Sequence, residues 1–174
     1  MRKNKLKSQR GFTLAELLVV IAIIGVISII AFANYRAGEK QFSLQRSGYK
    51  LIQDTRRAQN MAMAARAIGG QVPTGYGVYF TSGSPTQYIL FADNDGNGLR
   101  GAGDADIETL YLEAGVTITA LAPASPLTIV FYPPDPSVLI SGNPSNNSAS
   151  ITLNYSGGVA KTVSVNKVGL IEIQ

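Results

Sequence analysis

The sequence predicts an α+β fold in which one long amino-terminal helix packs on antiparallel β-sheet. Its 174 residues suffice for one folded domain together with a tethering segment. All eight prolines lie at Pro73 or later, so no proline interrupts a helix before that point. From Gly75 onward the pattern changes to short runs of β-branched and aromatic residues separated by Gly, Pro and Asn.

The first half of the helix is apolar enough to cross a membrane. Residues 17–35 form a run of 19 residues without a charge, and nearly all of them are Leu, Ile, Val, Ala or Phe. As a helix this run is about 28 Å long, close to the hydrocarbon thickness of a bilayer. It exceeds the apolar region of a cleaved secretory signal, and no small-residue cleavage site follows it before Arg36. We expect a transmembrane helix, with a buried core helix or a plain signal anchor as the alternatives.

The second half of the helix is amphipathic. Between Phe42 and Ile68, small or apolar residues recur at three- and four-residue steps, which marks one face for burial. Gly69 and Gly70 are expected to end the helix, because glycine is favoured directly after a helical segment.

The remaining residues predict one or two antiparallel sheets covered on one face by the helix. Residues 76–80 and 87–91 flank Ser82-Gly83-Ser84-Pro85, which indicates a hairpin. Further strands are expected at residues 109–112, 116–121, 127–132, 150–155, 159–165 and 170–173. Gly157 and Gly158 are expected to form another hairpin turn, and residues 133–136 and 142–148 to form loops.

The basic residues are concentrated at the amino terminus. The chain has 15 Lys and Arg against 11 Asp and Glu, and five of the basic residues stand among the first 11 residues: Arg2, Lys3, Lys5, Lys7 and Arg10. The rest of the chain therefore has 10 basic and 11 acidic residues, a net charge of −1. A nucleic-acid-binding protein needs cations on its folded body, so we expect no nucleic-acid partner. A basic stub before an apolar helix predicts a single-pass membrane protein whose amino terminus is cytoplasmic and whose carboxyl-terminal domain lies outside.

The chain contains no His, Cys or Trp. Zinc fingers, iron–sulfur sites, Cys nucleophiles, Ser-His-Asp triads and disulfide frameworks are therefore excluded. We expect the protein not to be an enzyme and to hold no cofactor, apart from the candidate cation discussed below.

One acidic residue stands at the start of the apolar helix. An ionisable side chain at the centre of a membrane helix costs on the order of 3 kcal/mol, so such residues usually have a partner. A cut between Gly11 and Phe12 would create an α-amine one helical turn from the carboxylate of Glu16. The two charges would then neutralise each other within one chain or between neighbouring chains. The alternative is that Glu16 reaches the membrane interface on its own.

Residues 10–25, RGFTLAELLVVIAIIG, resemble the amino-terminal signature of type IV prepilins and type II secretion pseudopilins. The resemblance rests on a short basic leader, then Gly11, Phe12 and Glu16, then a long apolar run. It implies that a prepilin peptidase cuts after Gly11 and methylates Phe12, and that Glu16 pairs with the amine of a neighbouring subunit during filament assembly. It also implies a pilin-like organisation, with a leader at 1–11 that is removed on processing, a transmembrane and filament-core helix at 12–35, an amphipathic continuation at 36–70, and a β-rich globular domain at 71–174.

The resemblance extends more weakly downstream. Residues 88–98 and 165–171 look like minor pilins and pseudopilins of the secretion-H and fimbrial-T type. Some fimbrial-T-like pilins bind DNA through Arg-rich residues in the terminal stretch. This chain has Leu170, Ile171 and Glu172 there, with Lys167 the one nearby cation, so the sequence does not favour DNA uptake.

The loop that follows residues 87–91 is a candidate calcium site. Asp93, Asp95, Asn97 and Gly98 fit positions 1, 3, 5 and 6 of an EF-type loop, and Asp104 falls at position 12. Position 12 is normally the longer Glu, and no flanking helices are expected. Asp and Asn beside Gly also form β-turns without any ligand, so a plain turn stays the alternative.

Two other patterns in this region are weaker. Residues 96–101 spell G-x-G-x-x-G, but a strand-like run follows where a dinucleotide-binding site needs a helix. Asp104, Asp106 and Glu108 are acids of the kind that glycosidases pair, but no substrate cleft is predicted around them. We expect these three residues to form a solvated turn.

The sequence thus predicts a structural subunit, a pilin or pseudopilin, that a prepilin peptidase processes and that assembles through its amino-terminal helix. The alternative is an unprocessed, membrane-anchored binding module outside the cytoplasm, with calcium as its candidate ligand. A third hypothesis is an anchored hydrolase that uses carboxylates.

Overall fold

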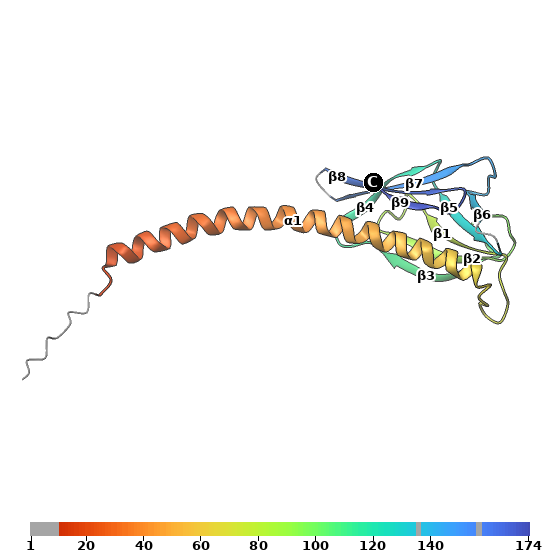
Figure 1. The fold of residues 1–174 in the computed structure, drawn as a ribbon, viewed down its shortest axis with the longest axis horizontal. Coiled ribbons are helices and arrows are strands. Elements are labelled where there is room, and N and C mark those ends of the chain that lie inside the picture. The colour runs from red at the N-terminus through yellow and green to blue at the C-terminus, as the bar shows by residue number, and fades with distance from the viewer. Residues whose placement is uncertain (1–10, 135–136, 156–157) are drawn as a thin grey trace, which may run out of the picture. The chain divides into compact units, whose positions relative to one another are not determined.

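A computed structural model describes residues 11–134, 137–155 and 158–174, with the backbone alone at residues 33–37. The five leader cations, Asp135 and Pro136 of an expected loop, and Gly157 of an expected turn lie outside the described residues. Within them the chain forms one α-helix followed by nine β-strands (Figure 1). The elements are α1 (Leu14–Met63), β1 (Gly75–Phe80), β2 (Gln87–Asp93), β3 (Ala105–Tyr111), β4 (Val116–Ala122), β5 (Leu127–Tyr132), β6 (Ser137–Ile140), β7 (Ser148–Tyr155), β8 (Val159–Asn166) and β9 (Ile171–Ile173).

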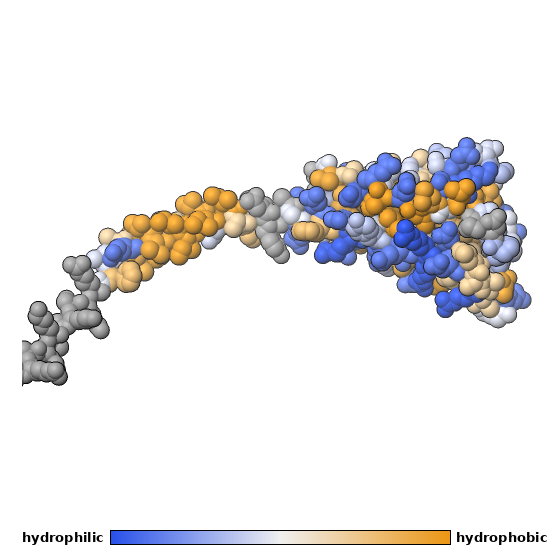
Figure 2. All heavy atoms as spheres, viewed as in Figure 1, coloured by the Kyte–Doolittle hydropathy of each residue, from blue (hydrophilic) through white to orange (hydrophobic). Residues whose placement is uncertain are grey.

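The contacts divide the chain into two units, Met1–Glu39 and Lys40–Gln174. The first unit contains the apolar part of α1, which Figure 2 shows as a continuous run of hydrophobic residues. The exposed fraction of the large apolar residues in this part ranges from 46% at Val20 to 81% at Leu14, and none of them is buried. This segment therefore has no protein core of its own.

The second unit is built from two antiparallel sheets and the carboxyl half of α1. One sheet has the strand order β3-β2-β1-β5-β6 and the other the order β4-β7-β8-β9. Val78 of β1 lies opposite Leu90 and Ile129 in the first sheet, and Ile151 lies opposite Val163 in the second. Inward-facing residues of both sheets join the buried face of α1 in a single hydrophobic core. The α+β fold with a long amino-terminal helix is therefore confirmed.

The predicted apolar stripe of the helix is buried, since Leu44, Leu51 and Ala58 have no exposed surface. The predicted end of the helix at Gly69 is wrong, because α1 ends at Met63. Ala65 adopts a left-handed conformation with φ 44°, and its N–H donates to the carbonyl of Ala62 at 3.0 Å, while the next N–H reaches back to Met61 at 3.2 Å. These two bonds close the helix with a Schellman cap.

The two glycines make a tight turn in place of the expected cap. Gly69 and Gly70 have φ angles of 60° and 87°, and they connect Ile68 and Gln71, which form an antiparallel bridge. Positive φ at both central residues is the requirement of a type I′ hairpin turn, which glycine meets at low cost.

Two strands differ from the prediction. β3 begins at Ala105, so Asp106 and Glu108 lie in a strand and the expectation of a solvated turn was wrong for them. Each pairs with an arginine, Asp106 with Arg100 and Glu108 with Arg57, both at 2.6 Å, and this pairing makes two acids acceptable in an edge strand. β6 was not predicted, because its four residues stand between Pro136 and Gly142, in a stretch whose prolines and glycine favour loops.

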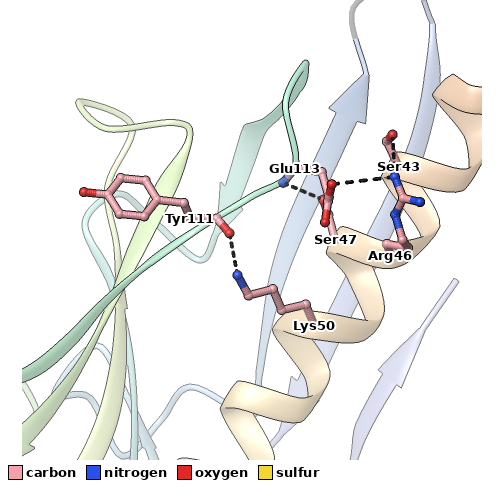
Figure 3. A network of polar contacts seen from close by, with 6 residues as sticks. All are labelled: Ser43, Arg46, Ser47, Lys50, Tyr111 and Glu113. Carbon is pink, nitrogen blue, oxygen red and sulfur yellow. Dashed lines mark hydrogen bonds and ion pairs between the residues drawn. The ribbon is translucent and has the colours of Figure 1, made fainter.

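Polar contacts join α1 to the end of β3 (Figure 3). The ammonium of Lys50 donates to the carbonyl of Tyr111 at 2.9 Å. The N–H of Glu113 donates to the hydroxyl of Ser47 at 3.1 Å, and the guanidinium of Arg46 lies 3.6 Å from the Glu113 carboxylate.

Candidate functional site

The amino terminus of α1 is held by a reciprocal pair of side chains. Thr13 stands directly before the helix, and its backbone N–H donates to the Glu16 carboxylate at 2.9 Å. The Thr13 hydroxyl donates to the same oxygen at 3.0 Å and accepts the N–H of Glu16 at 3.2 Å. This arrangement is a capping box, which satisfies backbone donors that a helix otherwise leaves without partners.

The cap fixes the direction of the Glu16 side chain. Because its carboxylate accepts the Thr13 N–H, the acid folds back over the first turn, beside the peptide bond that joins Phe12 to Thr13. Phe12 is 90% exposed, and a Cβ at Gly11 would meet nothing within 4 Å, so no described residue packs tightly against these two residues. The structure thus places the Glu16 carboxylate at the N–H of Thr13, directly after Phe12, and its pairing with a Phe12 amine stays a prediction.

The helix behind this cap offers an apolar surface. Within the described residues, Leu14–Phe32 is the one segment long and apolar enough to cross a membrane. Its hydroxyl at Ser28 donates to the carbonyl of Ile24 at 2.7 Å, so this polar group is satisfied within the helix.

The second candidate site is the loop of residues 94–104, which connects β2 to β3. Asp93, Asp95 and Asp104 each place one carboxylate oxygen so that the three atoms lie within 4.8 Å of one another. The sequence predicted this grouping from the spacing of the acids. The strands on both sides are antiparallel, so the G-x-G-x-x-G pattern lies in a hairpin loop and not in a dinucleotide-binding unit.

Asp93 is the buried centre of the loop, with no exposed surface. One carboxylate oxygen accepts the N–H of Gly96 at 2.7 Å, and the other accepts the N–H of Gly98 at 3.0 Å and the hydroxyl of Tyr132 at 2.7 Å. Burial and this hydrogen bond raise the pKa of the Tyr132 phenol, which therefore stays a donor. These backbone and phenol donors were not predicted, because no pattern in the sequence marks which N–H groups a carboxylate will accept.

The other acids of the loop are also occupied by hydrogen bonds. Asp104 accepts the N–H of Asn94 at 2.9 Å and that of Gly101 at 2.7 Å. Asp95 accepts the N–H and the side-chain amide of Asn97, at 3.1 Å and 2.7 Å. The amide oxygen of Asn97, the predicted fourth ligand, accepts the N–H of Leu99 at 2.6 Å and thus has a partner within the loop.

The loop lies across the outer face of the first sheet. The hydroxyl of Thr128 on β5 donates to the carbonyl of Gly98 at 2.6 Å. Arg100 lies 5.1 Å from the ring centre of Tyr79 on β1 and forms two hydrogen bonds with Asp106, at 2.7 Å and 2.6 Å. Asp104, Asp106 and Glu108 thus face different partners, and this arrangement does not form the carboxylate pair of a glycosidase.

Comparison with known proteins identifies the amino-terminal segment. Residues 6–32 match the family model of the prokaryotic N-terminal methylation motif. No curated protein and no solved structure matches this chain. The apolar helix near the amino terminus and the motif that it contains are together consistent with membrane anchoring. Residues 6–32 therefore carry the prepilin-type methylation signature of the type IV pilins and pseudopilins, which are a structural and non-enzymatic kind of protein.

Proposed function

We propose that this protein is a structural subunit of a type IV pilus or a type II secretion pseudopilus. The observation that supports this function is the capped Glu16 at the head of an apolar helix, whose carboxylate accepts the N–H of Thr13, directly after the exposed Phe12. Prepilin peptidase is the proposed processing enzyme, and other pilin or pseudopilin subunits are the proposed partners. The subunit waits in the cytoplasmic membrane, with its carboxyl-terminal domain outside, and then enters the filament.

In this mechanism, cleavage after Gly11 releases the α-amine of Phe12, which is then methylated. The new cation lies beside the Glu16 carboxylate of its own chain or meets that of a neighbour. When helices bundle, water leaves, and an unpaired carboxylate becomes costly, while a pair is tolerated. Such a pair contributes little stability by itself but selects the register in which neighbouring helices pack.

The amino-terminal mass of the protein from its native cells tests the processing step. We expect the mature chain to begin at a methylated Phe12, without the first 11 residues. A mature chain that retains Met1 would contradict processing and leave the unprocessed, membrane-anchored binding module as the function.

Substitution of Glu16 tests the assembly step. Glu16→Ala should insert into the membrane at wild-type levels, because it removes a charge from the apolar segment. It should fail to enter filaments, because the Phe12 amine then lacks its acid. Glu39→Ala is the matched control, since Glu39 is an exposed acid on the same helix beyond the apolar part. Filament incorporation is measured in sheared surface fractions, and wild-type incorporation of Glu16→Ala would refute the pairing.

A second candidate function is calcium binding by the loop of residues 94–104. It is supported by the three carboxylate oxygens within 4.8 Å of one another at Asp93, Asp95 and Asp104. Calcium needs six to eight oxygens, and sites in extracellular modules bind with Kd on the order of 10⁻⁴–10⁻³ M. Calorimetric titration of the full chain in detergent should show binding in that range that Asp95→Asn abolishes and Glu172→Gln preserves. An absence of heat at millimolar calcium would exclude the site.

A further inference from the structure

The loop of residues 94–104 contains two dipeptides that are prone to spontaneous rearrangement. Asp95-Gly96 and Asn97-Gly98 are the two places in the whole sequence where Asp or Asn precedes Gly. In such a pair the glycine nitrogen is unhindered and can attack the preceding side chain. A long-lived protein with two adjacent pairs of this kind in a surface loop requires a structural feature that slows the reaction.

The chemistry is a ring closure that needs only water. At Asn97, the Gly98 nitrogen loses its proton to solvent and attacks the side-chain carbonyl carbon. A carbon–nitrogen bond forms, the bond to the amide nitrogen breaks, and ammonia leaves. Water then opens the succinimide to aspartate or isoaspartate. At Asp95 the Gly96 nitrogen attacks the protonated form of the carboxyl group, a carbon–nitrogen bond forms, the bond to the hydroxyl breaks, and water leaves. Water then opens the succinimide to aspartate or isoaspartate.

The fold requires glycine at positions 96 and 98, so the tendency to form a succinimide cannot be removed by replacing these glycines. Gly96 and Gly98 both have φ 73°, which disfavours side chains. A Cβ at Gly96 would lie 2.9 Å from the Thr74 methyl group, and one at Gly98 would collide with Leu139. Replacement of either glycine would therefore damage the packing of the loop on the sheet.

One buried carboxylate holds both of the nitrogens that would attack. The Gly96 N–H donates to one oxygen of Asp93 at 2.7 Å, and the Gly98 N–H donates to the other at 3.0 Å. Removal of either proton would place a second negative charge beside a carboxylate that has no exposed surface, which is strongly disfavoured. Each nitrogen must leave this hydrogen bond before it can react.

The side chains that would be attacked are restrained as well. The amide oxygen of Asn97 accepts the Leu99 N–H at 2.6 Å, and its amide nitrogen donates to Asp95 at 2.7 Å. Both carboxylate oxygens of Asp95 accept hydrogen bonds from Asn97. Each dipeptide is therefore fixed on both sides of the bond that would form.

We propose that the buried carboxylate of Asp93 protects the Asp95-Gly96 and Asn97-Gly98 pairs from succinimide formation, and that Asn97 and Asp95 are latent modification sites. This role assigns to Asp93 a function that requires neither a metal nor a filament. Loss of protection at Asn97 would add a carboxylate to a loop that already brings three together, and the loop would then open further.

The folded and unfolded forms of the wild-type full-length chain provide the first test. Both are incubated with EDTA, one in detergent micelles and the other in concentrated urea, at mildly alkaline pH for deamidation at Asn97 and at mildly acidic pH for isoaspartate at residue 95. Peptide mapping by liquid chromatography and mass spectrometry follows both products. Breaking a hydrogen bond to a charged acceptor should slow the reaction roughly tenfold or more in the folded chain. Equal rates in the two forms would overturn the proposal.

Two substitutions then assign the effect to Asp93. Asp93→Asn keeps the shape but leaves one acceptor oxygen for two glycine N–H groups, so at least one of the two sites should react several-fold faster than in the folded wild type. Tyr132→Phe removes the third partner of Asp93 and leaves both glycine bonds, so its rates should match the wild type. If Asp93→Asn folds, as circular dichroism would show, and reacts at the wild-type rate, the role of Asp93 is refuted. If Asp93→Asn does not fold, the comparison of folded and unfolded wild type still tests whether the fold protects the two pairs. The Tyr132→Phe variant then tests the role of Asp93, because faster reaction in that variant would contradict protection by the two glycine hydrogen bonds alone.

Discussion

At the scale of single residues, Arg100 joins the acidic loop to the sheet. Its guanidinium forms two hydrogen bonds with the Asp106 carboxylate and lies over the ring of Tyr79. The hydrogen bond to Arg100 holds the pKa of Asp106 below its ordinary value of 3.8, and the same bond raises the pKa of Arg100. Paired planar groups of this kind are stronger than most surface ion pairs.

The pKa of Asp106 predicts a pH dependence. A carboxylate whose pKa is lowered by folding stabilises the protein above its unfolded pKa, and this contribution is lost as the pH falls through the lowered value. Asp106→Asn should therefore reduce the free energy of unfolding by at most about 1 kcal/mol at neutral pH and by much less at a pH below the lowered pKa of Asp106. Urea unfolding of the wild type and variant at both pH values measures the difference. A constant difference would contradict the ion pair, and Glu172→Gln is the control at an exposed acid of β9.

At the scale of elements, α1 contacts the end of an edge strand of the first sheet. β3 is an edge strand, and unpaired edges invite association with other chains. Lys50 binds the carbonyl of Tyr111, and Ser47 accepts the N–H of Glu113, so the helix occupies backbone groups where this strand ends (Figure 3). The helix therefore contributes polar contacts at this edge in addition to its buried apolar face.

Ser47 gives a sharp test of this contact. Ser47 is fully buried, so Ser47→Ala leaves the N–H of Glu113 without its acceptor and should destabilise the second unit by about 1–3 kcal/mol. Ser43→Ala is the matched control one helical turn away, because the Ser43 hydroxyl accepts only from the exposed Arg46 at 3.3 Å, and it should change stability by less than about 0.5 kcal/mol. Thermal and urea unfolding of both variants checks the prediction, which equal effects would contradict.

The elements also show what the sequence could and could not predict. Periodicity located α1 and most of the strands, because their inward residues alternate or recur over five or more positions. It failed for β6, which has four residues, and for the acidic start of β3, whose charges are satisfied by Arg57 and Arg100 from distant parts of the chain. The spacing of the loop acids predicted that Asp93, Asp95 and Asp104 would meet. It did not predict the partners of Asp93, since backbone N–H groups and Tyr132 carry no signature in the sequence.

At the scale of the whole molecule, the two units have different requirements. The buried hydrophobic residues of the described chain all lie between Leu44 and Ile171, within the second unit. The apolar side chains that the structure describes between Phe12 and Phe32 are all exposed. Folding of the globular part therefore owes nothing to packing by residues 11–32.

A shortened chain tests this independence. Residues 40–174 expressed alone should be soluble and should unfold cooperatively, with a midpoint within a few degrees of the full chain in detergent, because no core residue is removed. Calorimetry and near-ultraviolet circular dichroism measure this. A fragment that aggregates or lacks fixed tertiary structure would show that the apolar segment contributes to folding.

The exposed apolar helix of residues 14–32 limits the environments through which the protein can pass. Each large side chain from Leu14 to Phe32 loses roughly 1.5–3 kcal/mol if it leaves lipid for water. Summed over these side chains, the free energy of transfer to water is too large for the helix to leave the membrane into water, even briefly. In the proposed filament, each helix should therefore exchange its lipid neighbours directly for protein neighbours, without passing through water.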